Sequence, residues 1–328
     1  MKMHKPIAQF APINAAYNTV FQPNLLSLGL VVPLERYTNG PVPTMTCHLE
    51  RVRMAEDLGF AAVWLRDVPF NVPSFGDAGQ TFDPFVYLGF LAGQTSRIAL
   101  GVASVILPLR HPAHVAKAAA SVDVLSGGRL LLGVASGDRP EEYPAMNMSF
   151  EDRGGRFRDS IDYIRAMAAD FPEYETKQGV SHGAMDMLPK PMGGKLPLLV
   201  TGGSCQHPDW VAANSDGWIT YPRDAGSQAQ AIGDYRTRVA TLALPDKPVM
   251  QSLYIDLLDN PDAEPRPIHL GFQSGVKYLH RYLEALQQAG VNHVALNLRL
   301  NSGDTEATMK RLADDILPAF PTERAAHV

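Results

Sequence analysis

The sequence has little cysteine, no excess of basic residues and a low share of charged residues. Cys47 and Cys205 are too few for a disulfide framework or a cysteine zinc site, and both are compatible with a reduced cytoplasm. The formal net charge is −5 and charged residues make up 19% of the chain, so the basic patch typical of nucleic-acid or membrane-surface proteins is missing. We therefore expect a cytoplasmic protein with neither a nucleic-acid nor a membrane partner.

Long apolar runs are also missing. The longest stretch without charge, residues 6–34, is interrupted by polar residues and prolines, and it contains no continuous apolar span of about 20 residues. Lys2 and Lys5 precede no compact apolar segment, so no secretory signal is expected. The hydrophobic share of 45% nevertheless supplies ample core and excludes intrinsic disorder.

The sequence does contain a repeated alternation of strand-like and helix-like segments. Short apolar runs bounded by Gly or Pro predict strands at residues 25–32, 61–65, 98–107, 130–135, 196–200, 217–220, 249–256 and 291–298. Apolar residues at helical spacing predict helices at residues 46–58, 84–95, 112–125, 156–169, 207–214, 227–242, 274–289 and 305–316. The order of these segments is strand then helix throughout.

Glycines mark the joints between these segments. Gly59, Gly127 and Gly290 each stand just past a helix, where a left-handed residue is needed, and an apolar strand follows within a few residues. The fold class predicted is therefore α/β, a closed (β/α)8 TIM barrel, as a single domain over residues 1–328. An open doubly wound sheet is the alternative, but the glycine-rich turn it commonly has after strand 1 is missing. The Gly/Pro-rich stretches 71–79 and 178–194 predict loop insertions at the C-terminal face that close over the site.

In such a barrel the chemistry is expected at the C-terminal ends of the strands. The residues there are polar, cationic and rich in glycine: Arg66 and Asp67 after strand 2, Arg110 and His111 after strand 3, Ser136 to Arg139 after strand 4, and Thr201 to Ser204 after strand 5. The loop after strand 5 predicts a phosphate cradle of backbone amides, with an ordinary strand-to-helix turn as the alternative.

Asp67, Arg110 and His111 are the candidate catalytic residues, and each has a structural alternative. Asp67 is an acid or base, or the ion-pair partner of Arg66 or Arg110. His111 acts in catalysis, or it caps the helix that begins at Pro112. Neither a hydrolase triad nor a zinc motif is present, so a bound cofactor is expected to carry the chemistry.

Three segments resemble the bacterial luciferase-like flavin-dependent monooxygenases. They are AEDLGFAAVWLRD (residues 55–67), RIALGVASVILPLRHPAHVAKAAASVDVLSGGRLLLGVASGD (97–138) and PLLVTGGSCQHPDWVAANSDGWIT (197–220). The resemblance covers most of the chain and implies a (β/α)8 barrel that binds reduced FMN or, in some branches, a deazaflavin coenzyme. It further implies O2 and a small organic substrate as partners, together with a flavin reductase that supplies the reduced flavin.

The resemblance also implies which residues bind the cofactor. The flavin ring is expected over the end of strand 3 and against strand 4, and the phosphate in the loop after strand 5: Ala103, Ser104, Ala135, Ser136, Gly202, Gly203, Ser204 and Cys205. A cis peptide bond is expected between Ala103 and Ser104, because the family commonly carries one there.

Two positions depart from luciferase itself. Val68 stands where luciferase has a catalytic histidine, which argues against light emission and aldehyde oxidation. Ser136 stands where luciferase has an arginine that contacts the phosphate, and Arg139 is the candidate replacement. Two other functions stay open, a non-catalytic flavin-binding protein and a barrel lyase or isomerase without flavin, for which Glu35 after strand 1 is the available carboxylate.

A homodimer through the helices after strands 2 and 3 is implied by the same resemblance. The helix at residues 112–125 carries Ala113, Ala116, Ala119 and Ala120 at helical spacings, and such a small-residue face permits close approach of another helix. The alternative is that these alanines pack on the barrel of their own chain.

Overall fold

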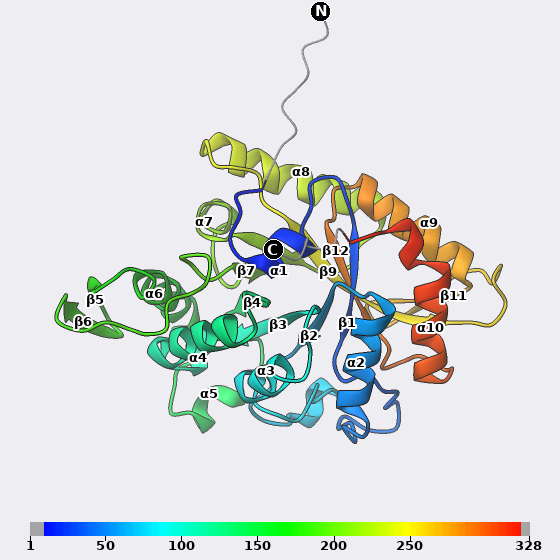
Figure 1. Ribbon diagram of the computed structural model, residues 1–328, viewed down its shortest axis with the longest axis horizontal. Coiled ribbons are helices and arrows are strands. Elements are labelled where there is room, and N and C mark those ends of the chain that lie inside the picture. The colour runs from blue at the N-terminus through cyan, green and yellow to red at the C-terminus, as the bar shows by residue number, and fades with distance from the viewer. Residues whose placement is uncertain (1–9, 323–328) are drawn as a thin grey trace, which may run out of the picture.

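Eight parallel strands close into a barrel with the helices outside it (Figure 1). The computed structural model describes residues 10–322, so Lys2, Lys5 and the outer ends of the predicted 1–328 domain lie outside the described residues. The barrel strands are β1 (Ser27–Val31), β2 (Ala62–Leu65), β3 (Ala99–Ile106), β4 (Leu130–Ala135), β7 (Leu198–Thr201), β8 (Gly217–Thr220), β9 (Val249–Leu257) and β12 (His293–Asn297). Pairing of β12 with β1 completes the ring, which confirms the barrel and excludes the open sheet.

All eight predicted helices are present, at bounds close to the predicted ones. They are α2 (His48–Leu58), α3 (Pro84–Ala92), α4 (Pro112–Leu125), α6 (Arg153–Ala166), α7 (Pro208–Asn214), α8 (Ala225–Thr241), α9 (Val276–Gln288) and α10 (Thr305–Asp315). Proline opens α3, α4 and α7, where its missing N–H costs nothing. Between residues 10 and 322 the structure holds no helix with the length and apolar character that a bilayer span requires.

Short elements that the periodicity did not predict complete the fold. They are α1 (Ala15–Val20), α5 (Glu142–Ala145), β5 (Glu173–Thr176), β6 (Gly179–His182), β10 (Arg266–Ile268) and β11 (Gly271–Ser274), with single 3-10 turns η1 (Pro73–Phe75), η2 (Leu107–Leu109) and η3 (Leu317–Ala319). Strands β10 and β11 extend the sheet beyond β9, whereas β5 and β6 form a separate antiparallel hairpin at the edge of the molecule (Figure 1).

The segment 178–194 lies at the opposite end of the barrel from the predicted one. It connects α6 to β7, and a connection from a helix to the next strand lies at the N-terminal ends of the strands. The Met192 amide accordingly donates to Asp123 near the end of α4 (2.9 Å), and Lys190 donates to the carbonyl of Met167 just past α6 (3.3 Å). The prediction that this segment closes over the site is therefore wrong.

Helix α1 closes the N-terminal end of the barrel. Its Tyr17 and Val20, with the adjoining Phe21, are buried against inward-facing barrel residues such as Leu131 and Ala295. The Tyr17 hydroxyl donates to the carbonyl of Asp216 just before β8 (2.6 Å). Helix α1 thus covers this end of the barrel.

Trp64 and His293 fill the middle of the barrel. The Trp64 indole N–H donates to His293 Nε2 (2.8 Å), so the ring proton of His293 sits on Nδ1 and is donated to Ser27 Oγ (2.7 Å). Gly101 makes room for this pair, because a Cβ there would overlap the Trp64 ring. Complete burial lowers the pKa of His293 to about 3, and the ring stays neutral.

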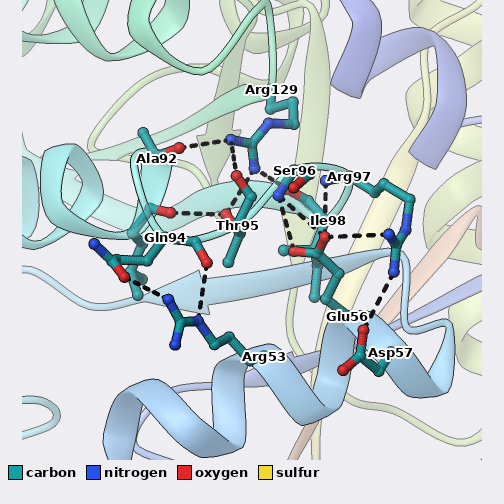
Figure 2. Close-up of polar contacts among 11 residues, drawn as sticks. Arg53, Glu56, Asp57, Ala92, Gln94, Thr95, Ser96, Arg97, Ile98 and Arg129 are labelled. Carbon is teal, nitrogen blue, oxygen red and sulfur yellow. Dashed lines mark hydrogen bonds and ion pairs between the residues drawn. The ribbon is translucent and has the colours of Figure 1, made fainter. Parts of the chain in front are cut away.

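A polar network fixes where β3 begins (Figure 2). Glu56 on α2 accepts from the amides of Ser96 (3.0 Å) and Arg97 (3.1 Å). Arg129, just before β4, donates to the hydroxyl (2.8 Å) and the carbonyl (3.0 Å) of Thr95. These bonds set the register of β3 against β4, and the far ends of these two strands carry part of the site described next.

Candidate functional site

A cavity of about 840 Å³ opens at the C-terminal ends of the strands. Residues from or just after all eight barrel strands line it, together with His269 of the β10–β11 turn. All nine residues predicted to bind a cofactor line this one cavity: Ala103, Ser104, Ala135, Ser136, Arg139, Gly202, Gly203, Ser204 and Cys205. The fold therefore brings together three strand ends that lie up to about a hundred residues apart in sequence.

The loop after β7 has the backbone form of an anion cradle. Gly202, Ser204 and Cys205 all have positive φ (54°, 45° and 59°), and the Ser204 hydroxyl donates to the carbonyl of Thr201 (2.7 Å). Within the described part of the chain, the amides of Gly203, Ser204 and Cys205 donate to no acceptor. Consecutive free amides in such a turn suit a phosphate or another anion.

Arg153 stands beside this loop and was not singled out from the sequence. It begins α6 and lines the cavity, its guanidinium lies over the Phe150 ring (3.6 Å from Cζ to the ring centroid), and Nη1 donates to the Phe150 carbonyl (2.8 Å). The next residue, Gly154, packs so closely on Cys205 that an added Cβ would lie 3.0 Å from the Cys205 Cβ. Arg153 is thereby placed next to the anion cradle.

The ends of β3 and β4 form the wall beside the cradle. The peptide bond between Ala103 and Ser104 is cis, as predicted. The Ser104 hydroxyl is hydrogen-bonded to the Thr201 hydroxyl, and Ser136 Oγ lies 3.5 Å from Cys205 Sγ. Hydroxyls from two neighbouring strand ends therefore lie against the loop that forms the cradle.

The candidate catalytic residues do not all reach the cavity. Asp67 lines it, but its carboxylate accepts from the Ile106 amide (3.1 Å) and forms a two-point ion pair with Arg110 (2.7 and 2.9 Å). Arg110 also pairs with Asp83 (2.8 Å), while the ring of His111 accepts from the Ala113 amide and caps α4. Of the residues described, Arg110 and His111 are not among those that line the cavity, so their contacts match the structural alternatives.

Loop 71–79 contributes Phe75, Gly76 and Asp77 to the lining of the cavity. That it closes over the site stays a prediction. The Asp77 carboxylate pairs with Arg66, lies 3.3 Å from Arg299, and accepts from the Tyr37 hydroxyl (2.8 Å). Burial alone would raise the pKa of Asp77, but Arg66, the Gly79 amide and Tyr37 together hold it below its usual value. The loop is thus tied by a charged carboxylate to residues that follow β1, β2 and β12.

Arg139 reaches this loop and not the cradle. Its Nη2 donates to the Asp77 carbonyl (2.9 Å), and its Cζ lies 4.7 Å from the centroid of the Phe75 ring. Its Nη1 is buried without a hydrogen-bond partner among the described residues. The sequence grouped Arg139 with the phosphate-binding residues, but its contacts link it to the loop after β2.

Known proteins share this architecture. An uncharacterized protein of Mycobacterium tuberculosis (strain H37Rv) is 33% identical over 188 residues, which cover 52% of this chain and 66% of that protein, or just under two thirds of its length. An F420-dependent secondary alcohol dehydrogenase in complex with an F420-acetone adduct superposes with a TM-score of 0.73 at 17% identity, over 90% of this chain and 99% of that one. The oxygenating constituent of 3,6-diketocamphane monooxygenase of Pseudomonas putida, in complex with FMN, gives 0.70 at 14% identity, over 90% and 99% of the two chains. The luciferase-like monooxygenase family matches residues 28–322, and the chain therefore belongs to that family.

Proposed function

We propose that the chain is a flavin-dependent monooxygenase that binds reduced FMN in the cavity at the strand ends and uses O2 to oxidise a small organic substrate. The observation that carries this proposal is the convergence of all nine predicted cofactor residues on one cavity of about 840 Å³. Proteins with this fold include complexes with FMN and with F420, and membership of the family makes oxidoreductase chemistry the expectation.

The residues of the cavity fit such a cofactor. Three free amides at Gly203 to Cys205 and the neighbouring Arg153 form a cradle of positive character suited to one phosphate group. Ala103, Ala135 and Met250 supply apolar wall on which a planar ring can lie. The same cavity therefore offers an anionic end and an apolar body, as a flavin nucleotide requires.

When bound, a reduced flavin supplies the two electrons of the reaction. The part of the chain is then to hold and shield the cofactor. In this proposal the cradle and Arg153 anchor the phosphate, and the hydroxyls of Ser104 and Ser136 donate to the polar edge of the ring. Loop 71–79, held down by Asp77, keeps bulk water from the reacting face.

A deazaflavin coenzyme is the second candidate, because F420 also carries a phosphate and an F420-dependent dehydrogenase shares the fold. In that case the reaction would be a hydride transfer without O2. The lyase or isomerase alternative loses the residue that kept it open, since Glu35 accepts from the Thr44 amide (2.6 Å) and is not among the residues that line the cavity. A non-catalytic flavin-binding protein would differ by holding oxidised FMN tightly without turnover.

The test is to titrate the purified protein with FMN, reduced FMN and F420 in turn, and then to mix the reduced-FMN complex with air while absorbance is followed. We expect reduced FMN to bind more tightly than FMN and to give a transient absorbance that free reduced FMN does not give. Selective binding of F420 would favour the dehydrogenase. Reoxidation of reduced FMN at the rate seen in buffer, with no binding of either cofactor, would refute a flavin-type function.

A further inference from the structure

Arg139 is a buried cation that forms no salt bridge within residues 10–322. Only 5% of the residue is exposed, and its Nη1 has no hydrogen-bond partner among the residues described. Its remaining contacts are neutral, the Asp77 carbonyl and the Phe75 ring. A buried charge without a counter-ion is unfavourable, so we expect the Arg139 guanidinium to contact an anionic ligand when one is bound.

The Asp77 carboxylate, which belongs to the loop that Arg139 contacts, is already used by other arginines. The Asp77 side chain pairs with Arg66 and with Arg299, whereas Arg139 bonds only to the Asp77 carbonyl. Asp138 also lines the cavity but is exposed to solvent. The buried Glu142 carboxyl is close enough to act on Arg139 through its charge, but among the described residues neither of its oxygens accepts a hydrogen bond from Arg139. Burial and the neighbouring Arg66 lower the pKa of Arg139, and the charges of Glu142, Asp138 and Asp77 offset this only in part. A bound anion would offset both effects.

The cofactor phosphate does not account for this arginine. The start of α6 ties Arg153 to the cradle, because the carbonyl of Gly154 accepts from the Gln206 side chain (2.8 Å) within that loop. Arg139 is tied to the loop after β2 instead. The cavity therefore has two arginines without ion-pair partners, one at the cradle and one at loop 71–79, whereas FMN has a single phosphate.

We propose that Arg139 binds the carboxylate of the substrate, which is a small organic acid. This inference rests on the proposed function, since it names the substrate class for the same cavity. Nη1 donates to a carboxylate oxygen, and the Phe75 ring holds the guanidinium plane in place. Val68 and Ile106, which also line the cavity, supply apolar surface for the carbon skeleton.

The test measures binding of matched acid and amide probes to the full chain by isothermal titration, first without cofactor. The pairs are acetate and acetamide, hexanoate and hexanamide, and benzoate and benzamide. At least one acid should bind more tightly than its amide, and Arg139→Gln should weaken that acid about tenfold, the value of one charge-assisted hydrogen bond, with the amide unchanged. Arg153→Gln is the matched control: it should leave acid binding within about twofold while it weakens FMN.

The outcomes separate this inference from the proposed function. Equal affinity of every acid and its amide, no binding of any acid at millimolar concentration, or unchanged acid binding in Arg139→Gln would overturn it. If Arg139→Gln does not fold, Arg139→Lys replaces it and should bind the acid with intermediate affinity, because a lysine keeps the charge but loses the fork. Acid binding that is retained in a chain that binds no flavin would refute the flavin function and leave the anion site standing.

Discussion

At the scale of single residues, the polar groups of the site fall into two kinds, those with a hydrogen-bond or ion-pair partner and those without one. Asp67 and Arg110 satisfy each other, and His111 is used as a helix cap. The free amides of the 203–205 loop and the free Nη1 of Arg139 have no such partner within the described chain. Residues with unused hydrogen-bonding capacity, and not the most reactive residue types, therefore mark where ligands are expected to bind.

Ser204 provides a test of the phosphate cradle. Ser204→Asp puts a carboxylate beside the amides, so we expect FMN affinity to fall by about tenfold or more through charge repulsion. Riboflavin, which has a hydroxyl in place of the phosphate, should lose much less. Fluorescence titration measures both, and Ser204→Ala serves as the control that removes the hydroxyl without adding charge. Equal losses for FMN and riboflavin would show that the phosphate binds elsewhere.

His293 makes the stability depend on pH. Its folded-state pKa of about 3 lies below the ordinary value of 6.5. Between these two pH values the His293 ring is therefore protonated in the unfolded chain and neutral in the folded chain. The stabilisation is present above about pH 6.5 and is lost as pH falls towards 3. Between pH 7 and pH 5 we expect a loss of about 2 kcal/mol in the free energy of unfolding from this residue.

Urea denaturation of the wild type and of His293→Gln checks this expectation. The variant should be less stable at pH 7, because the Trp64 and Ser27 bonds are disturbed, and should lose less stability on acidification. His114→Gln, at an exposed position, is the matched control. Parallel pH dependence of the wild type and His293→Gln would contradict the assignment.

At the scale of elements, several barrel strands have room for no side chain at one inward position. One inward position in each of β1, β3 and β4 is a glycine (Gly29, Gly101 and Gly133), and an added Cβ at each would collide with a neighbour. Gly101 makes room for the Trp64 ring, and Gly29 makes room for the His293 ring. A local pattern search reads them only as apolar or small residues within a strand.

Gly101→Ala should destabilise the protein strongly, because the new methyl group would overlap the Trp64 ring within a closely packed barrel. We expect a loss of about 2 kcal/mol or more in the free energy of unfolding. Gly89→Ala, in α3 with open space around the added Cβ, is the control and should be neutral or stabilising by about 0.5–1 kcal/mol. Similar thermal midpoints for wild type and Gly101→Ala would contradict the packing described.

Helix α5 carries the buried carboxyl group of Glu142, whose oxygens accept no hydrogen bond from residues 10–322. Burial raises the pKa of Glu142 to about 7, against the lowering effect of Arg139. Stability from this group is present at low pH and is lost as pH rises through 7, so Glu142→Gln should gain about 1–3 kcal/mol at pH 8 and nothing at pH 4. Denaturation curves at both pH values decide it, and a variant less stable than wild type at pH 8 would count against the shift.

At the scale of the whole molecule, the predicted homodimer needs a different basis from the one that the sequence suggested. Ala116, Ala119 and Ala120 of α4 are buried within their own chain, so the alanine face packs on the barrel. The exposed apolar side chains of α3 and α4 are instead Val86, Phe90, Val124 and Leu125. In a dimer through α3 and α4, these four side chains would be buried against the second chain.

Light scattering at micromolar concentration tests the dimer. We expect a mass of two chains for the wild type and of one chain for the double substitution Val86→Glu, Phe90→Glu, because two buried charges cannot be paired across a symmetric interface. The same substitutions should leave the circular dichroism spectrum unchanged, since both side chains are exposed in the single chain. A monomeric wild type would refute the dimer.

What the sequence by itself determined is what depends on neighbours along the chain. Apolar periodicity and glycine stop signals located the eight barrel strands and the eight helices around them, because each element buries one face and must end at a turn. They did not locate the short elements α1, α5, β5, β6, β10 and β11. The strand-end rule then selected several residues that line the cavity, among them Asp67, Ser136 and Ser204, but also Arg110 and His111, which do not line it. The resemblance added the cis bond after Ala103, which periodicity alone does not predict.

What only the tertiary structure decided is which of these groups meet. The contact of Asp77 with Arg299 joins residues more than 200 positions apart. Arg153 lies at the cradle because the start of α6 bonds to Gln206, whereas Arg139 lies at loop 71–79 because it bonds to the Asp77 carbonyl. Sequence spacing carries no information about such contacts, because they arise when a closed sheet brings distant strand ends to one mouth. The barrel was therefore predictable from local pattern, whereas the division of charge within its cavity was not.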